Sequence, residues 1–333
     1  MKISKIIHEN QSSPKAEIEQ FAIDVLTGLC SIPKQLSAKY FYDDTGSEIF
    51  QKITQHEDYY LTKTEFRILN EIKYTLPQII GEDEIDIIEL GAGDGHKTQI
   101  ILEGFLERNY KVNYYPIDIS EKAMTMLETN INSHKNLKVH GIVAEYFDGL
   151  RYLRSKSLNK QLVLFLGSNI GNFNRAQNQG FLRRLWNSLN ALDYVLIGFD
   201  LKKNISILTR AYNDSAGYTR EFNLNLLRRI NRDLGGDFDL NKFQHFGIYN
   251  PILGSMESYL LAIEEHDIYI KELEHSFHFD AFEPIHLEYS FKFLKSDIEF
   301  MSKHTGFKVI QHFSDTQEFF IDSLWKVTKE NRK

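Results

Sequence analysis

A short apolar run that ends in three glycines constrains the fold of this chain more than any other feature. Residues 85–90 read Ile-Asp-Ile-Ile-Glu-Leu, residues 91–95 read Gly-Ala-Gly-Asp-Gly, and apolar residues then recur with helical spacing over 98–106. A strand, a glycine turn and a helix in this order begin a βαβ unit. Glycine is required where a backbone turns sharply and approaches a ligand without a Cβ in the way.

The same alternation continues along the chain and predicts a doubly wound α/β fold. Further strands are expected at 112–117, 137–143, 162–166 and 194–199, with helices at about 121–131, 149–156 and 175–190. Strands separated by helical stretches form parallel sheets. Upstream, the pattern predicts helices at 15–30 and 64–76, separated by a Tyr/Phe-rich segment with turn signals at Asp43–Gly46.

After Asp200 the pattern changes. Residues 202–250 are expected to be mostly helical, from Ile205 through Leu234, and strands are expected to follow at 256–263 and 286–293. The chain then ends in a helix at 296–304 and two strands, 307–312 and 319–327, which suit an antiparallel hairpin at the sheet edge. Only six prolines occur, and no linker rich in Pro, Gly or Ser divides the chain. A second domain must therefore be inserted into the first or wrapped around it.

Composition excludes several classes of protein. Hydrophobic residues make up 42% of the 333, enough for a sizeable core, and no apolar stretch reaches the ~18 residues of a membrane-spanning helix. The net charge of −7 argues against a nucleic-acid partner. Cys30 is the only cysteine, which excludes an intrachain disulfide and a cysteine-rich metal site. We interpret it as a plain thiol at a helix end, in a reducing compartment such as the cytoplasm. We expect a monomer without a metal ion.

The spacing of the glycines favours S-adenosylmethionine over a dinucleotide as the ligand of this turn. A dinucleotide fingerprint has its third glycine three residues after the second, where helix and strand pack closely. His96 occupies that position here, and the third glycine comes early, at Gly95. Glu89 stands just before the turn, and an acidic rim suits a cofactor that carries a sulfonium and an amino group rather than a pyrophosphate. A dinucleotide oxidoreductase is the alternative.

The strands that follow supply further candidates for the cofactor site. Asp118 ends the second strand, where a carboxylate can accept both hydrogen bonds of a ribose diol; a solvated strand-end acid is the alternative. After the third strand, Glu145 and Tyr146 are candidates for an adenine acceptor and its apolar cover, or are ordinary loop residues. The expected cofactor site comprises Glu89, Gly91, Gly93, Gly95, Lys97, Asp118, Glu145 and Tyr146.

The fourth strand stops in the polar sequence Gly167-Ser-Asn-Ile-Gly-Asn172. Open α/β sheets bind ligands at the carboxyl ends of their strands, so these residues are expected where substrate and cofactor meet. The alternative is a turn that caps the helix from Arg175, with Asn172 or Asn174 as the N-cap. Both interpretations can hold together, with Asn174 as the cap and Asn172 facing the substrate.

Motifs with a specific pattern are spread over nearly the whole chain. They are Lys39–Ser47 (KYFYDDTGS), Asp58–Glu65 (DYYLTKTE), Phe165–Asn172 (FLGSNIGN), Arg210–Thr219 (RAYNDSAGYT), Phe222-Asn223 with Asn231-Arg232, Asp237–Asp239 and Glu288–Lys292 (EYSFK). Together they resemble the histidine α-N-methyltransferase family of ergothioneine biosynthesis, which makes trimethylhistidine (hercynine) in three methylations. Fungal relatives methylate a prenylated tryptophan, so the family fixes an amino-acid α-amine better than it fixes the side chain.

The resemblance implies a Rossmann-like class I methyltransferase domain of residues 64–201 and 293–333, which binds S-adenosylmethionine and releases S-adenosylhomocysteine. It implies a smaller α+β substrate domain of residues 11–63 and 202–292. The residues implied to hold the amino acid's carboxylate and amine, and to act as catalytic residues, are Tyr59, Asn172 and Tyr212. Those implied to line the rest of the pocket are Gly167 and Thr219 at the same end, Phe50 as a wall, and Tyr42, Glu288 and Ser290 at the imidazole.

Glu288 is the main reason to prefer histidine as the substrate. An imidazole donates one N–H and accepts at its other nitrogen, and Glu288 and Ser290 alternate along one face of a predicted strand. An exposed polar face is the alternative interpretation. Ser258 aligns with a family position that is usually methionine, so that the side chain at this part of the pocket is smaller and more polar, although Met256 lies two residues away. Alternative functions are methylation of another amino acid or of a histidine ring nitrogen, and ligand binding without turnover.

Overall fold

The computed structural model describes residues 2–6, 14–154 and 159–329, and this part of the chain forms two compact units. Unit 1 holds the N-terminal strand with Ile6, Leu61–Lys202 and the chain from Lys292 onward; unit 2 holds the residues from the first helix to Tyr60 and Lys203–Phe291. The sequence placed the changes of domain at 63/64, 201/202 and 292/293, and it did not predict the N-terminal strand of unit 1. The predicted start at residue 11 lies outside the described residues.

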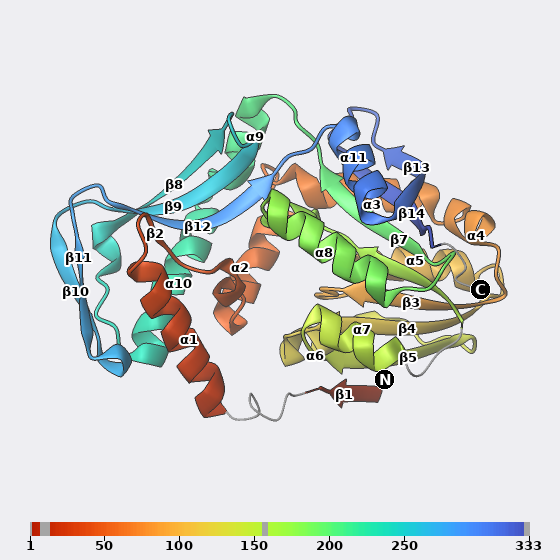
Figure 1. The fold of residues 1–333 in the computed structure, drawn as a ribbon, viewed down its shortest axis with the longest axis horizontal. Coiled ribbons are helices and arrows are strands. Elements are labelled where there is room, and N and C mark those ends of the chain that lie inside the picture. Colours follow the sequence, from red (N-terminus) through yellow and green to blue (C-terminus); the bar gives the residue numbers. More distant parts are fainter. Residues whose placement is uncertain (1, 7–13, 155–158, 330–333) are drawn as a thin grey trace. The chain divides into compact units, whose positions relative to one another are not determined.

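Unit 1 is built on an eight-stranded sheet with the order β1-β5-β4-β3-β6-β7-β14-β13 (Figure 1). The first six strands in that order are parallel, and the β13–β14 hairpin pairs antiparallel to β7. The strands are β1 (Lys2–Lys5), β3 (Glu84–Leu90), β4 (Lys111–Asp118), β5 (Leu137–Val143), β6 (Lys160–Phe165), β7 (Tyr194–Asp200), β13 (Phe307–Ser314) and β14 (Phe320–Val327). The predicted Rossmann-like class I sheet, with its antiparallel edge hairpin, is therefore confirmed.

Helices cover both faces of this sheet, because right-handed crossovers that start from the central strands in opposite directions lie on opposite faces. Neighbouring helices α4, α5 and α6 form one layer, and α7, α8 and α11 form the other. The helical segments of unit 1 are α3 (Tyr60–Ile72), α4 (Thr75–Ile80), α5 (His96–Leu106), α6 (Glu121–Asn130), α7 (Tyr146–Arg154), η2 (Asn169–Asn172), α8 (Arg175–Ser188) and α11 (Lys295–Thr305). The predicted end of the helix at 156 lies outside the described residues.

The order in which the chain adds strands to the sheet reverses between β3 and β6. The chain runs from β3 through β4 to β5 on one side, and from β6 to β7 on the other, while β3 and β6 pair with each other. In open α/β sheets, ligands bind at the carboxyl ends of the strands at such a switch point. The two polar turns that the sequence singled out, after β3 and after β6, are therefore neighbours.

The chain leaves unit 1 and re-enters it at adjacent positions. Leu201 forms a parallel bridge with Phe293, and Lys202 N donates to Phe293 O at 2.9 Å. Next to this bridge, Lys292 Nζ lies 2.8 Å from Asp200 Oδ2, and both side chains are fully buried. A long insertion after β7 thus leaves the sheet intact because its two ends are tied together by backbone pairing and a buried ion pair.

Unit 2 combines a four-stranded sheet of order β2-β12-β9-β8, in which only the β2–β12 pair is parallel, with a separate β10–β11 hairpin. Its elements are α1 (Pro14–Leu29), β2 (Lys34–Gln35), η1 (Ala38–Phe41), α2 (Asp44–Gln55), α9 (Ile205–Tyr212), α10 (Tyr218–Leu234), η3 (Leu240–Lys242), β8 (Phe243–Asn250), β9 (Ser255–Ala262), β10 (His266–Ile270), η4 (Lys271–Leu273), β11 (His275–Phe279) and β12 (Pro284–Phe291). Apolar residues from α1, α10, the sheet and the hairpin share one core.

Several predicted elements were wrong, mostly in unit 2. The turn signals at Asp43–Gly46 begin helix α2, because the Asp43 side chain accepts from Gly46 N as an N-cap. The helical residues predicted from Ile205 through Leu234 are confirmed as α9 and α10, but residues 235–250 are not helical, because Gly235 ends α10 in a left-handed conformation and β8 follows. The β10–β11 hairpin was not predicted. In unit 1, the helix expected at 64–76 is two helices, and Pro77 lies in the first turn of the second, where its missing N–H costs nothing.

Among the described residues, no helix is both long and apolar enough to cross a membrane. Cys30 directly follows α1 and is exposed. The thiol is therefore not part of the core.

Candidate active site

The glycine turn after β3 has the conformation that its glycines permit. Gly91, Gly93 and Gly95 all have positive φ, between 54° and 75°. At Gly91 a Cβ would lie 3.0 Å from the Tyr146 hydroxyl oxygen, so a side chain here would fill the space next to the turn. Gly91 N donates to Ile117 O at 2.9 Å, which fixes the turn against the end of β4. The turn therefore has the sharp bend without side chains that we predicted from its glycines.

Asp118 lies at the end of β4, beside this turn. Its carboxylate accepts from Gly93 N at 3.2 Å and from Ser120 N at 2.9 Å. Burial raises the pKa of the Asp118 carboxyl, and the backbone N–H groups oppose that shift. A carboxylate has about four acceptor sites, so the two backbone bonds leave capacity for a diol.

Glu89 was expected at the rim of the turn, and that expectation was wrong. Its side chain is 4% exposed and receives a very short hydrogen bond from the Tyr114 hydroxyl. The position follows from strand alternation, since residues 87 and 89 share a face of β3 and Ile87 lies opposite Tyr114. Burial raises the pKa of Glu89 to about 7, even though hydrogen bonds from Thr98 and Tyr114 lower it.

The predicted pair after β5 divides into two different environments. Tyr146 begins α7 and its hydroxyl lies next to Gly91, as described above. Glu145 is exposed, and its backbone carbonyl accepts from Asp148 N and Gly149 N at the start of the helix. Tyr146 is therefore near the glycine turn after β3, while Glu145 is exposed to solvent.

The turn after β6 lies beside the glycine turn. The Asn169 side-chain nitrogen would be 3.6 Å from a Cβ on Gly91 and 3.8 Å from one on Gly167. Asn174 caps α8 in a capping box with Gln177, while Asn172 ends η2 and is exposed. The predicted role of Asn174 as the N-cap is confirmed. The role of Asn172 at the substrate stays a prediction.

The sequence did not predict two contacts of Glu65 near the turn after β6. Gly167 N donates to Glu65 Oε1 at 2.7 Å, and Glu65 Oε2 lies 2.5 Å from Lys97 Nζ. Lys97, predicted as a cofactor residue, is the second residue of α5. Glu65 belongs to a motif that the sequence does contain, but a glutamate within a helical pattern gives no signal that it will be buried.

In unit 2, polar residues gather on one face of the sheet. Glu288 on β12 lies directly opposite Ser258 on β9, and Ser290 lies opposite Met256. Opposed residues of an antiparallel pair point to the same face, so the predicted sharing of a face by Glu288 and Ser290 is confirmed. The Tyr212 hydroxyl is 2.6 Å from Ser290 Oγ. Ser258 is thus the cross-strand neighbour of Glu288, while Met256 is the neighbour of Ser290 on the same face.

A second group in unit 2 is aromatic. The Tyr42 and Phe50 rings are 5.5 Å apart, and Phe50 and Tyr59 are 6.4 Å apart, both edge to face. The ring centroid of Phe222, in α10, lies 5.5 Å from that of Tyr42 and 5.7 Å from that of Phe50. Phe222 belongs to one of the sequence motifs, but no role was predicted for it. Three predicted pocket residues therefore form one aromatic wall.

The end of α9 that carries Tyr212 is fixed against β8. The Asn213 side chain exchanges two hydrogen bonds with the Gly247 backbone, at 3.0 and 3.1 Å. A Cβ at Gly247 would lie 2.8 Å from that side chain, so glycine is required there. His245 Nε2 is 3.0 Å from Tyr212 O, and its Nδ1 is 2.8 Å from the Asn223 amide. Burial lowers the pKa of His245, which favours its neutral form.

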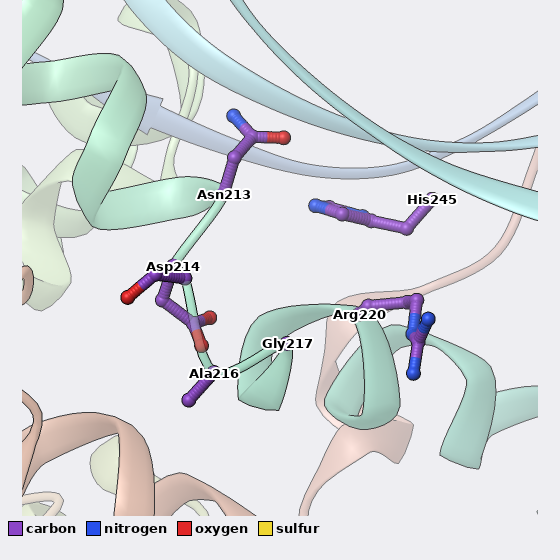
Figure 2. Close-up of a pocket in the computed structure, with 7 residues that line it drawn as sticks. Asn213, Asp214, Ala216, Gly217, Arg220 and His245 are labelled. Carbon is purple, nitrogen blue, oxygen red and sulfur yellow. The ribbon is translucent and has the colours of Figure 1, made fainter.

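A polar pocket of about 390 Å³ opens at the loop between α9 and α10 (Figure 2). It is lined by Asn213, Asp214, Ser215, Ala216, Gly217, Arg220 and His245. None of the predicted substrate residues lines it, although Tyr212 and Thr219 flank the loop in sequence. The Asp214 carboxylate accepts from Tyr218 N and Thr219 N, both at 2.7 Å, which fixes Thr219 at the start of α10.

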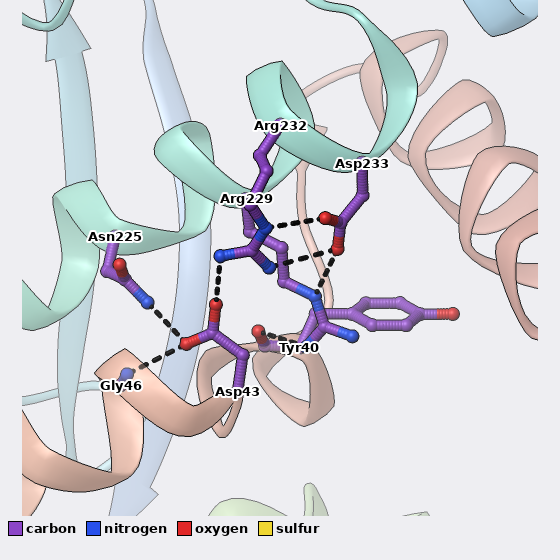
Figure 3. A network of polar contacts seen from close by, with 7 residues as sticks. All are labelled: Tyr40, Asp43, Gly46, Asn225, Arg229, Arg232 and Asp233. Carbon is purple, nitrogen blue, oxygen red and sulfur yellow. Dashed lines mark hydrogen bonds and ion pairs between the residues drawn. The ribbon is translucent and has the colours of Figure 1, made fainter.

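Asp43 joins the start of α2 to α10, next to Tyr42 in the chain (Figure 3). Its carboxylate accepts from Gly46 N and Asn225 Nδ2, both at 2.8 Å, and pairs with Arg232 at 2.9 Å. Burial opposes ionisation, but these hydrogen bonds and the arginine outweigh it and hold the pKa of Asp43 below its usual range. The network fixes the segment that carries Tyr42 and Phe50.

The sequence profile of the S-adenosylmethionine-dependent, histidine-specific methyltransferases matches residues 21–327. The chain belongs to this family. A histidine N-alpha-methyltransferase of Mycolicibacterium smegmatis is 30% identical over 92% of the chain and 94% of its own length, and one of Mycobacterium tuberculosis is 32% identical over 81% and 83%. The Neurospora crassa ergothioneine biosynthesis protein 1 is 29% identical over 97% of the chain, which spans 38% of that longer protein.

The cofactor of this methyltransferase is S-adenosylmethionine. All eight residues predicted to hold it belong to unit 1, where the turns after β3 and β6 adjoin. Of the ten residues predicted to bind the substrate, Gly167 and Asn172 belong to unit 1; the other eight belong to unit 2 and are Tyr42, Phe50, Tyr59, Tyr212, Thr219, Ser258, Glu288 and Ser290.

Proposed function

We propose that this methyltransferase transfers methyl groups to the α-amino nitrogen of free L-histidine and forms N,N,N-trimethylhistidine. The observation that carries the proposal is the polar cluster of unit 2, in which Glu288 lies opposite Ser258 and the Ser290 hydroxyl contacts Tyr212. A carboxylate and a hydroxyl on one sheet face complement the donor and the acceptor of an imidazole. An indole has no acceptor nitrogen and gains less from the same pair.

The chemistry requires positioning rather than a strong base. S-adenosylmethionine supplies an electrophilic methyl group, and the acceptor nitrogen must be a neutral amine. A pocket that disfavours the ammonium form lowers the pKa of the amine toward neutrality. We assign Tyr59, Asn172 and Tyr212 to the carboxylate and amine of the amino acid, so that nitrogen, methyl and sulfur are held in line. Tyr supplies both a hydroxyl and an apolar body for this task.

A second candidate is a different amino acid as the substrate, and Ser258 favours it. This residue is 2% exposed and opposite Glu288, at a position where the family resemblance leads us to expect methionine. The smaller side chain leaves more room beside Glu288. A relative from Claviceps purpurea that carries the name 4-dimethylallyltryptophan N-methyltransferase is 28% identical over 56% of the chain.

The two candidates are separated by a substrate panel. The purified protein is incubated with S-adenosylmethionine and, in turn, with histidine, tryptophan and tyrosine, and the new methyl groups are located by NMR. We expect histidine to be preferred, with the methyl groups on the α-nitrogen. A methyl group on the imidazole ring, or a higher kcat/KM for another amino acid, contradicts the proposal.

We further infer that the enzyme acts as a monomer in the cytoplasm. The single exposed thiol supports a reducing compartment. Size-exclusion chromatography with light scattering tests the oligomeric state, and a dimer at micromolar concentration contradicts this part of the proposal.

A further inference from the structure

Three ionisable side chains meet inside unit 1, behind the turn that follows β6. Glu65 of α3 uses one oxygen for Gly167 N, at 2.7 Å, and the other for Lys97 Nζ, at 2.5 Å. Asp322 of β14 is the third member, and Glu65 and Asp322 are both 0% exposed. One buried carboxylate therefore holds both a backbone amide of the second turn and the ammonium of a predicted cofactor residue.

The room for this cluster comes from a glycine in β7. Gly198 pairs with Asp322 across the sheet, and a Cβ at Gly198 would lie 2.6 Å from Glu65 Oε1. Opposed residues point to the same face, so the missing side chain of Gly198 leaves the space that the Glu65 carboxylate fills beside Asp322. Protein cores are closely packed, so any side chain at residue 198 would displace the Glu65 carboxylate.

Asp322 needs a proton in this position. Within residues 2–6, 14–154 and 159–329, neither of its oxygens meets a hydrogen-bond donor. Burial and the negative charge of Glu65 raise the pKa of Asp322, and only Lys97 opposes the shift. Two buried carboxyl groups this close cannot both ionise beside a single ammonium. With the proton on Asp322, its O–H can be donated to Glu65.

Lys97 retains donors beyond this contact. An ammonium has three N–H groups, and the side chain of Lys97 is 25% exposed, whereas that of Glu65 is 1% exposed. Burial opposes the charge on Lys97, but the attraction and the hydrogen bond of Glu65 outweigh it and raise the pKa of Lys97. The ammonium is thus held on its buried side and can meet an anionic group of a ligand on the other.

We propose that Glu65 is a positioning residue, which fixes the Lys97 ammonium for the carboxylate end of the cofactor and the Gly167 amide for the substrate side, while a protonated Asp322 supports it. The inference rests on the proposed function for the assignment of Lys97 and Gly167. It assigns different roles to the two buried acids: Glu65 accepts from Gly167 N and Lys97 Nζ, and Asp322 donates to Glu65.

The first test replaces the acid that accepts both hydrogen bonds. Glu65→Gln replaces the two acceptor oxygens by one oxygen and one N–H₂ group, so the side chain cannot accept from both Gly167 N and Lys97 Nζ. We expect S-adenosylhomocysteine to bind about 10-fold more weakly by calorimetry, and the KM for S-adenosylmethionine to rise by the same factor. Glu71→Gln, on the exposed side of the same helix, is the matched control. A merely structural role lowers kcat through loss of active protein and leaves KM unchanged, and that result overturns the proposal.

The second test compares two replacements of Asp322. Asp322→Val removes the donor and is expected to weaken S-adenosylhomocysteine binding about 10-fold, while Asp322→Asn restores a donor and brings affinity back to within about 3-fold of the original. If Asn is as damaging as Val, Asp322 acts as a charged group and the proposal fails. Should the Val variant not fold, the Asn variant decides alone.

An infrared difference spectrum gives a readout that does not depend on turnover. Because burial also raises the pKa of Glu89 to about 7, the spectra are recorded in the Glu89→Gln background. This protein should have the C=O stretch of a buried, protonated carboxyl group, and adding Asp322→Asn should remove that band. A spectrum of Asp322→Asn that retains the band contradicts the proposal. Cofactor-product binding and this band do not involve histidine, so their failure is distinguishable from a failure to methylate histidine.

Discussion

The two units of this methyltransferase position their candidate binding groups by different structural means. In unit 1 they are mainly backbone turns at the ends of parallel strands, where Gly91, Gly93 and Gly167 have positive φ. In unit 2 they are side chains, gathered by strand register and ring packing, such as Glu288 opposite Ser258. Backbone turns suit a ligand that is constant across a family, while side chains on a sheet face can change with the substrate. Substitutions in unit 1, other than at Gly167 and Asn172, should therefore alter stability or cofactor binding, and substitutions in unit 2 should alter the use of histidine.

The largest effect is expected from the buried ion pair of unit 1. Lys292→Met leaves the Asp200 carboxylate fully buried without its cation, which should lower the free energy of unfolding by about 3–5 kcal/mol. Chemical denaturation followed by circular dichroism measures it. Lys295→Met is the matched control, since Lys295 pairs with Glu318 at the surface and should cost less than about 1 kcal/mol. Similar losses in the two variants contradict the interpretation.

Glu89 should make the stability of unit 1 depend on pH. Burial raises its pKa to about 7 in the folded protein, above an unfolded value of about 4.3. The folded state therefore retains a proton that the unfolded state releases, and the wild type loses stability relative to Glu89→Gln as pH rises from about 4 to 7. The relative loss should reach about 3 kcal/mol and stay constant at higher pH. Denaturation of both proteins across this range measures it, and a difference independent of pH contradicts the expectation.

In unit 2, Glu288→Ala should affect only the amino acid. Losing the hydrogen bond from the imidazole to a carboxylate should lower kcat/KM for histidine by about 10- to 100-fold. The dissociation constant for S-adenosylhomocysteine should stay within about 2-fold of the original, since Glu288 belongs to the other unit. Equal losses of both, measured by kinetics and calorimetry, count against the separate tasks of the two units.

The smallest effect is expected from Tyr212→Phe. The change removes the hydroxyl that contacts Ser290 at 2.6 Å and leaves the ring in place, so the KM for histidine should rise by about 3- to 10-fold. Tyr269→Phe, at an exposed tyrosine of the β10–β11 hairpin, is the control and should change nothing. If both variants behave like the wild type, the Tyr212 hydroxyl does not bind the amino acid.

Apart from β1, the sequence predicted the strands of unit 1 to within a few residues, because apolar runs, glycines and helical spacing repeat along 85–199. It also predicted the Asn174 cap and the Gly91–Gly95 bend. It misplaced Glu89, because an acid next to a turn suggests an exposed position, whereas residues 85–90 are buried on both faces of β3. Local pattern describes an element well but does not decide which face of it becomes buried.

Unit 2 was harder to predict, for a physical reason. Asp and Gly serve turns and helix starts alike, so Asp43–Gly46 could not be recognised as the cap of α2. In β8, inward-facing positions are taken by His245 and Gly247, whose roles depend on contacts with α9, and the apolar alternation of a strand is lost. Glu65 was missed as a site residue because only the pairing of Gly198 with Asp322 opens the space for it.

A calorimetric titration of histidine into the protein, with and without saturating S-adenosylhomocysteine, tests the central assignment most directly. The account predicts saturable binding of one histidine per chain in the presence of the cofactor product, and its loss in Glu288→Ala. A protein that binds S-adenosylhomocysteine but takes up tryptophan or tyrosine in preference to histidine contradicts it.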